Sequence, residues 1–578
     1  MDREETYDVV IVGGGHNGIT AAAYLAKCGL SVCLLEERPE IGGGQENTEV
    51  APGVLVDPHA TLLYGAAAPG FEQLELWKYG FRVDWRAISI RALVFSGDRP
   101  VTPQERMVWP SAPTRDGVVW ASRKDMEGWA TLMGGNTRYP FLKDLLRAIY
   151  WCPPHPAGVE VTAQNIPYMQ VLREKAPEVY SESLLEMNMF DLLDRFMESE
   201  AMKVFYCSIS WFSGAAPHWE GMAIPSFGGA ALMYYGSLAI PHNGMHHYAH
   251  SIVRCALAYG ARVFTCCPVD EIIVENGVAV GVRLRETAVR AEKTIRARKA
   301  VISAVPVQKT FLDLISPRHT DIAFRQRVKD ISLKGGSLYV AHILMRGMPT
   351  YTPRFAKDKG TDLPAFVGHY PCDSRELFLG HVADIDARKT TPTLDLDKMF
   401  VGGGIGHNHL EEPGRVPADH WLFTPVYMQV PAPEYHVAGP EAVNEMKADV
   451  NAAILRAYSE VIANVNADTL AGYWANSPYD SELRNTGMIA GNWYATAHSL
   501  DQWAERRPLP ELARYRTPID GLYLCHQTSH PGGLCLMAVP YNLMHILIED
   551  GIAQPGAWWY PSPHYIAEQR APRATVSI

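Results

Sequence analysis

A glycine-rich loop followed by one acid is the N-terminal pattern that most directly predicts chemistry. Gly13, Gly15 and Gly18 have the spacing G-x-G-x-x-G, and Glu36 follows about 20 residues later. In a dinucleotide site the first glycine permits a tight turn, the second lets the backbone approach the pyrophosphate, and the third lets helix and strand pack closely. The acid can accept hydrogen bonds from ribose hydroxyls. The spacing therefore predicts a dinucleotide-binding site.

The elements around this loop are those that such a site needs. Residues 7–12 end in four consecutive β-branched residues, which is typical of a strand buried on both faces of a parallel sheet. A helical pattern follows and stops at Gly29, and residues 31–35 form a second strand that leads into Glu36. The alternative is a glycine-rich turn in an unrelated α/β domain, which would not require this order of elements.

The residues after the acid narrow the type of dinucleotide. Arg38 and the run Gly42–Gly44 follow Glu36 directly, and this pattern resembles the flavin amine oxidase and phytoene desaturase superfamily, where it holds FAD. The pair His16–Asn17 resembles the phytoene desaturase-like branch, which includes carotenoid isomerases. Many members carry Arg where this chain has Gly44, so we expect one contact to differ. The resemblance implies the following cofactor-lining residues: Gly13, Gly15, His16, Asn17, Gly18, Glu36, Glu37, Arg38, Gly43 and Gly44.

Two later segments fit the same superfamily. In the first, around residues 235–310, the residue matching Val269 normally contacts the adenine through its backbone. In the second, a strand and loop over residues 521–533 precede a helix that the superfamily places with its N-terminus at the flavin, where the helix dipole stabilises negative charge. By position, Met537, Ala538 and Asn542 would lie near the ring system. The positions of His526 and Met537 are usually Gly, so we expect both side chains to affect the site.

Acid–base residues are harder to assign, because the cofactor itself carries the hard step in such enzymes. Histidines near the flavin are the best candidates, since imidazole titrates in the useful range. His526 and His530 lead, followed by Tyr541, and His59 lies where the superfamily approaches the flavin from the other side. For His530 a backbone hydrogen-bonding role in its loop is the favoured alternative, and His59 has a structural alternative too.

The expected fold class is α/β. We predict a Rossmann-like FAD-binding domain assembled from three segments, residues 1–90, 235–310 and 515–578. The insertions between them, residues 91–234 and 311–514, should build an α+β substrate-binding domain.

We expect an FAD-dependent desaturase, dehydrogenase or isomerase that moves hydride from a substrate C–H bond to flavin N5. The branch resemblance and an aromatic first insertion indicate an apolar, isoprenoid- or lipid-like substrate, with O2 or a quinone as electron acceptor. One alternative is a flavin amine oxidase. Another is a redox-silent carrier of lipidated proteins, because Rab escort-type proteins share this fold.

Charge and patterning exclude several other classes. The net charge of −11 disfavours a nucleic-acid partner. The polar N-terminus lacks a signal-peptide pattern, and no apolar run is long enough to span a membrane, so we expect a cytoplasmic protein. The aromatic run Trp558–Tyr560 should pack on its own domain; a subunit contact in a homo-oligomer or a peripheral membrane contact is the alternative.

Two further patterns resemble binding sites without meeting their requirements. The stretch 401–407 is rich in glycine but fails the nucleotide fingerprint, and a flexible turn is expected there. His246 and His250 lie one helical turn apart, which suits metal chelation. No carboxylate or cysteine completes the set at fixed spacing, so no metal site is predicted.

Overall fold

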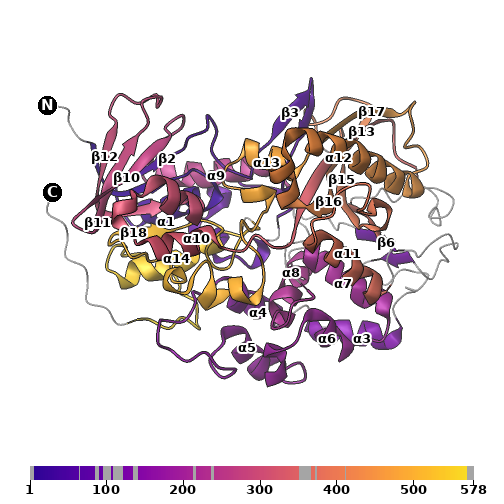
Figure 1. Cartoon of the computed structure of the whole chain (residues 1–578), viewed down its shortest axis with the longest axis horizontal. Coiled ribbons are helices and arrows are strands. Elements are labelled where there is room, and N and C mark those ends of the chain that lie inside the picture. Colours follow the sequence, from indigo (N-terminus) through magenta and orange to yellow (C-terminus); the bar gives the residue numbers. More distant parts are fainter. Residues whose placement is uncertain are drawn as a thin grey trace.

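A computed structural model gives the fold. It describes residues 5–63, 65–84, 90–94, 106–108, 122–134, 141–212, 217–235, 240–350, 366–370, 374–410, 412–534 and 536–568. Two large sheets lie at opposite sides of the molecule, with helices between and below them (Figure 1).

The first sheet has seven strands drawn from three distant parts of the chain. Five of them run parallel in the order β18, β12, β1, β2, β9, and the hairpin β10–β11 extends the sheet beside the first half of β12. The bounds are β1 Glu5–Val12, β2 Val32–Leu35, β9 Arg262–Phe264, β10 Val269–Glu275, β11 Val278–Leu284, β12 Thr294–Ser303 and β18 Leu522–Leu524.

Strand β1 is buried on both faces, as its run of β-branched residues predicts. Val9 and Ile11 belong to the core that holds helix α1 (His16–Lys27), whereas Val10 and Val12 belong to a second core on the other face. Helices α9 (Met245–Ala258) and α14 (Ala538–Glu549) pack beside α1, and α10 (Ile322–Lys329) contributes to the second core. Helices therefore cover both faces of a largely parallel sheet, which confirms the α/β Rossmann-type prediction.

The second sheet also has seven strands, in the order β17–β13–β16–β15–β14–β6–β7, and is mainly antiparallel. Helices α11 (Arg375–Asp386) and α12 (Ala432–Val461) pack on it, and α13 (Pro478–Arg484) follows β17. We propose that this sheet belongs to the substrate domain, with the boundaries given above. The strand bounds are β6 Ile90–Val94, β7 Arg106–Val108, β13 Gly336–Arg346, β14 Phe366–Tyr370, β15 Val401–Asn408, β16 His420–Pro431 and β17 Leu470–Asn476.

The flexible turn expected at residues 401–407 is wrong, because this stretch is strand β15. A Cβ at Gly404 would overlap the hydroxyl of Tyr458 in α12. The glycines therefore let a helix approach the sheet closely rather than loosen the chain.

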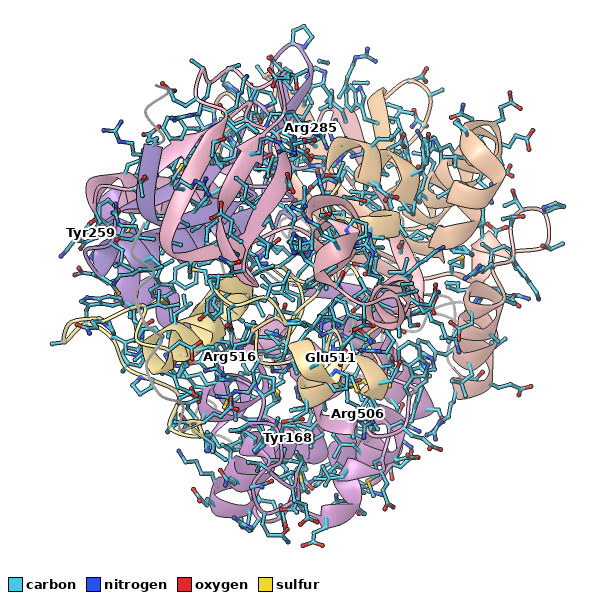
Figure 2. All side chains as sticks on the ribbon, turned by 60° about the vertical axis from the view of Figure 1, so that its left-hand side comes forward. Tyr168, Tyr259, Arg285, Arg506, Glu511 and Arg516 are labelled. Atoms are coloured by element: carbon cyan, nitrogen blue, oxygen red, sulfur yellow. The ribbon has the colours of Figure 1, made fainter. Side chains whose placement is uncertain are left out.

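A helical region lies below the two sheets. It contains α3 (Arg123–Leu132), α4 (Leu142–Tyr150), α5 (Pro167–Lys175), α6 (Met189–Asp194), α7 (Glu200–Phe212) and α8 (Ala223–Tyr235). Figure 2 shows side chains filling the space between the helical region, which carries Tyr168, and the C-terminal segment, which carries Arg516.

The aromatic C-terminal run packs on its own fold. Trp558 and Trp559 contact Tyr24 of α1 with ring centroids 6.1 and 5.8 Å away, and Trp559 also contacts Tyr541. Both tryptophans are half-buried. In the part of the chain that the structure describes, no helix is both long and apolar enough to cross a membrane.

Candidate cofactor site

One large cavity opens at the carboxyl ends of β1 and β2, where parallel sheets bind their ligands. It encloses about 1180 Å³ not filled by protein atoms. Most of the predicted cofactor residues line it: Gly13, Gly15, His16, Asn17, Glu36, Glu37, Arg38, Gly43, Gly44 and Val269, together with the catalytic candidates His59 and His526.

The glycine loop has the geometry that a pyrophosphate needs. Gly13 adopts a φ of 101°, which favours glycine, and a Cβ at Gly18 would overlap the carbonyl oxygen of Gly13. Gly15 is the N-cap of α1, and no side chain caps the helix there. The Cα of Gly43 lies 3.9 Å from where a Cβ of Gly15 would be, so two glycine turns meet. The N-terminus of α1 thus faces the cavity with its dipole and no capping side chain, which suits an anionic phosphate.

Glu36 is buried beside this loop and fixed by backbone donors. The amide N–H groups of Gly14 and Arg38 donate to its two carboxylate oxygens at 2.6 and 2.8 Å. Burial raises its pKa, and these two hydrogen bonds act in the opposite direction. Each oxygen has a second lone pair, so the carboxylate fits the ribose hydroxyls of a dinucleotide.

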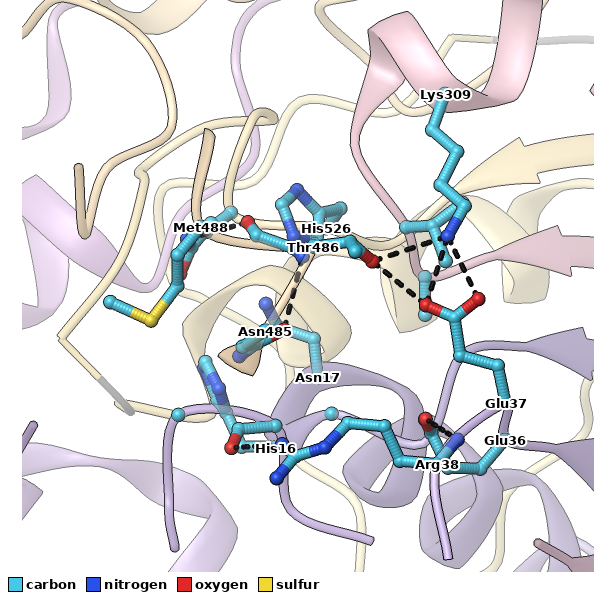
Figure 3. A pocket seen from close by; sticks show the side chains of 18 of the residues that line it. His16, Asn17, Glu36, Glu37, Arg38, Lys309, Asn485, Thr486, Met488 and His526 are labelled. Atoms are coloured by element: carbon cyan, nitrogen blue, oxygen red, sulfur yellow. Dashed lines mark hydrogen bonds and ion pairs between the residues drawn. The ribbon is translucent and has the colours of Figure 1, made fainter. Parts of the chain in front are cut away.

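Glu37 lines the same end of the cavity, and its carboxylate pairs with groups that the sequence did not single out. Nζ of Lys309 lies 3.0 Å from one carboxylate oxygen, and the Thr486 hydroxyl donates to the same oxygen at 2.8 Å. Figure 3 shows both side chains turned toward Glu37. Burial would raise the pKa of Glu37, but Lys309 and Thr486 outweigh it and lower the pKa.

Arg38 is held by a buried carboxylate. Its guanidinium donates to Glu46 at 2.6 Å, and Arg484 from α13 pairs with the other oxygen of Glu46 at 3.0 Å. Nδ1 of His59 lies 3.4 Å from Glu46. The Glu46 carboxylate therefore links Arg38, which lines the cofactor cavity, to the catalytic candidate His59 and to helix α13.

Three histidines on the cavity wall are neutral at physiological pH. Burial lowers the pKa of His16 and of His59 to about 4, and that of His526 to about 3. Nδ1 of His526 accepts from the backbone N–H of Thr528 at 3.2 Å. The proton of its neutral ring is thus assigned to Nε2, which lies next to Gly487.

The other end of the cavity is apolar. Ala60, Leu62, Met488, Trp493 and Leu534 line it. Trp493 packs edge-on against Tyr427 of β16, with ring centroids 5.1 Å apart. Sequence patterns held no signal for the contributions of the 485–493 segment, because only tertiary folding brings it to the nucleotide loop.

Gly18 packs against Gly13 behind the loop, and five further predicted residues do not line this cavity. His530 packs against Trp503 with ring centroids 5.0 Å apart, and its backbone oxygen accepts from Tyr515. The Tyr541 hydroxyl donates to the backbone oxygen of Tyr560. The remaining three are at the start of α14: Met537, Ala538 and Asn542. The side-chain amide of Asn542 donates to the backbone oxygen of Tyr150. Their roles in cofactor binding or catalysis stay proposals.

The structure shows the surroundings of two departures from the superfamily pattern. Met537 has a φ of 55°, a left-handed conformation that glycine adopts more easily. Its sulfur packs toward Gly70. At Gly44, where many relatives have Arg, the side chains of Met488 and Asn485 lie 3.7 and 4.0 Å from the position of a Cβ.

No group of three or more potential metal ligands occurs among the residues that the structure describes. The rings of His246 and His250 do meet edge-on, with centroids 4.2 Å apart. Nδ1 of His246 lies 3.1 Å from the backbone oxygen of Gln45.

Comparison with known proteins agrees with this geometry. Residues 8–137 match the family model of FAD dependent oxidoreductases. The fold is the Rossmann-type FAD-binding fold, and the cofactor is FAD.

Two proteins resemble the chain over almost its whole length. Pyridine nucleotide-disulfide oxidoreductase domain-containing protein 2 of Rattus norvegicus is 25% identical over 575 residues, 94% of each chain. One of the subunits of limonene dehydrogenase from Castellaniella defragrans is 23% identical over 590 residues, 98% of each chain. A solved structure of a putrescine oxidase variant shares the fold, with a TM-score of 0.56 and 15% identity over 94% of this chain and 98% of that one.

Proposed function

We propose that this chain is an FAD-dependent desaturase, dehydrogenase or isomerase that acts on an apolar, isoprenoid- or lipid-like small molecule. The observation that carries the proposal is the polarity of the cofactor cavity. One end has the glycine loop, Glu36 and the Glu37–Lys309 pair, whereas the other end is apolar around Leu62 and Trp493. A neutral hydrocarbon fits the second end without leaving a buried charge unpaired.

FAD, when bound, supplies the hydride acceptor, and the residues of the chain bind and orient it. The start of α1 and Gly43 would hold the pyrophosphate, and Glu36 would hold a ribose. The apolar wall excludes water and orients the substrate. His59 and His526 are neutral, so His59 can accept a substrate proton at a ring nitrogen, and His526 can donate a hydrogen bond through its Nε2–H.

The whole-length similarity to a limonene dehydrogenase chain supports a terpenoid substrate class. The likeness to putrescine oxidase concerns the fold alone, so an amine substrate is an outcome of the test. We propose O2 or a quinone as electron acceptor, because the reduced flavin must be reoxidised if net oxidation occurs. Homo-oligomerisation and peripheral membrane contact stay proposals without support from the described surface.

The experiment is anaerobic reduction of the bound flavin, followed by its absorbance, with limonene and putrescine as probes. Bleaching by limonene and not by putrescine is expected. Bleaching by putrescine alone would identify an amine oxidase, and purified protein that binds no FAD would overturn both enzyme functions. Isomerisation leaves the flavin oxidation state unchanged, so the product is also analysed for shifted double bonds with pre-reduced enzyme.

A further inference from the structure

A second cavity lies beside the cofactor cavity. About 440 Å³ in it and in its open mouth is not filled by protein atoms. Its walls come from the end of α7, the loop before β13, the end of α11, strand β16 and the segment 492–498. None of the predicted cofactor or catalytic residues lines it.

The two cavities share a partition. Trp493 lines the cofactor cavity, whereas its neighbours Asn492 and Tyr494 line the second one. Strand β16 runs past both, because Tyr427 packs against Trp493 and Gln429, two residues further along the same face, lines the second cavity. The second cavity therefore lies next to the cofactor cavity, on the other side of the segment that carries Trp493.

Aromatic and polar side chains line this compartment, and one buried acceptor in it has no partner among the described residues. Trp211 and Trp219 form apolar walls. The amide nitrogen of Gln429 donates to the backbone oxygen of Trp211 at 3.1 Å. Its oxygen Oε1 is buried and has no hydrogen-bond partner among the described residues, although the side chain is only 6% exposed. A buried acceptor without a donor costs free energy unless a ligand or water supplies one.

The charges of the compartment balance. Among the described residues that line it, Lys334 and Asp386 carry opposite charges and lie 3.5 Å apart at the more exposed end. Burial lowers the pKa of His218 to about 4, so its ring is neutral. Because the cavity has no net charge to offer an ammonium or a carboxylate, it suits a neutral ligand.

We infer that this compartment binds the polar end of a neutral, otherwise apolar alcohol, whose hydroxyl donates to Oε1 of Gln429 while its hydrocarbon body packs between Trp211 and Trp219. The inference rests on the proposed function, since it makes the compartment the outer part of the substrate site. It goes beyond that function by naming a hydroxyl and the residue that selects it.

The test compares three probes with one ring skeleton: menthol, p-menthane and menthylamine. Calorimetry with the flavin-loaded full chain should show menthol binding at least tenfold more tightly than either of the others. Gln429→Leu should remove the preference for menthol over p-menthane. The matched control is Gln73→Leu, another buried glutamine with two hydrogen bonds that lines neither cavity, and it should keep the preference.

Equal binding of menthol and p-menthane, tighter binding of menthylamine, or a preference that survives Gln429→Leu would each overturn the inference. If Gln429→Leu does not fold, Trp219→Ala provides the second test, because it should weaken menthol and p-menthane by a similar factor. Flavin reduction is measured separately. Bleaching by limonene without any menthol preference would reject this compartment and leave the proposed function standing, whereas the reverse pattern would reject the function alone.

Discussion

The two ends of the cofactor cavity are built in opposite ways. The nucleotide end is local in sequence, since Gly13 to Gly44 supply the loop, the acid and the second glycine turn within one βαβ unit. The apolar part collects Leu62 from one region of the chain, and Trp493 and Leu534 from another region more than 400 residues later. We conclude that cofactor identity is set by a short motif, whereas substrate choice is set by long-range packing.

The largest expected effect breaks the nucleotide end. In Gly18→Ala the new Cβ would overlap the carbonyl oxygen of Gly13, so the helix must move away from the loop. We expect purified protein with little or no bound FAD, measured by absorbance and by titration with added FAD. Gly380→Ala in α11 is the control, because nothing lies within 4 Å of its Cβ position. Stoichiometric FAD in Gly18→Ala would contradict the assigned role of the loop.

The next effect separates the two ends. Trp493→Ala removes the largest apolar side chain of the inner wall, so FAD should remain bound while anaerobic flavin reduction by limonene slows at least tenfold. Stopped-flow absorbance measures the rate. Trp77→Ala is the control, because Trp77 is 49% exposed and lines neither cavity. Loss of FAD together with activity would show that Trp493 holds the cofactor instead.

The third prediction concerns how the stability of the protein depends on pH through His59, which lines the cofactor cavity. Its pKa is about 4 in the folded state and about 6.5 when unfolded, so between these values the unfolded state binds more protons. Stability is full above pH 6.5 and falls as the pH drops toward 4, with about 1.4 kcal/mol for each unit of pKa difference. Thermal unfolding followed by circular dichroism measures this. His59→Asn should reduce the slope in that window, where His16 and His526 also contribute, and an unchanged slope would show that His59 does not contribute.

The smallest expected effect concerns the ion pair between Lys309 and Glu37 at the nucleotide end of the cavity. Lys309→Met removes the partner of Glu37, and because both side chains are partly exposed the pair is worth about 1 kcal/mol or less. We expect FAD to bind about threefold more weakly, with less dependence on salt than in the wild type. A double-mutant cycle with Glu37→Gln measures the coupling. A large loss of affinity would mean that Lys309 itself contacts FAD.

The sequence predicted the nucleotide end almost completely. Its residues follow one another along the chain, and β1, α1 and β2 appear where the apolar pattern places them. The same reasoning led to the wrong structure for residues 401–407, because a glycine needed for helix packing looks like a glycine needed for a turn.

Catalytic residues were harder to predict from the sequence, because proximity to a flavin depends on the direction in which a side chain points. His59 and His526 line the cavity, whereas His530 packs on Trp503 and Tyr541 bonds to the tail. Lys309 and Thr486 carry no motif, and only their pairing with Glu37 reveals them.

By itself, the sequence determined the class of cofactor, because phosphate binding needs a few backbone positions at fixed local spacing. The tertiary structure alone decided what faces that cofactor. It brought the 485–493 segment to the glycine loop, placed Trp493 between two compartments and left Gln429 with an unpaired oxygen among the described residues. The physical reason is that an apolar wall is defined by contacts between distant segments, and those contacts leave no periodic pattern in the chain.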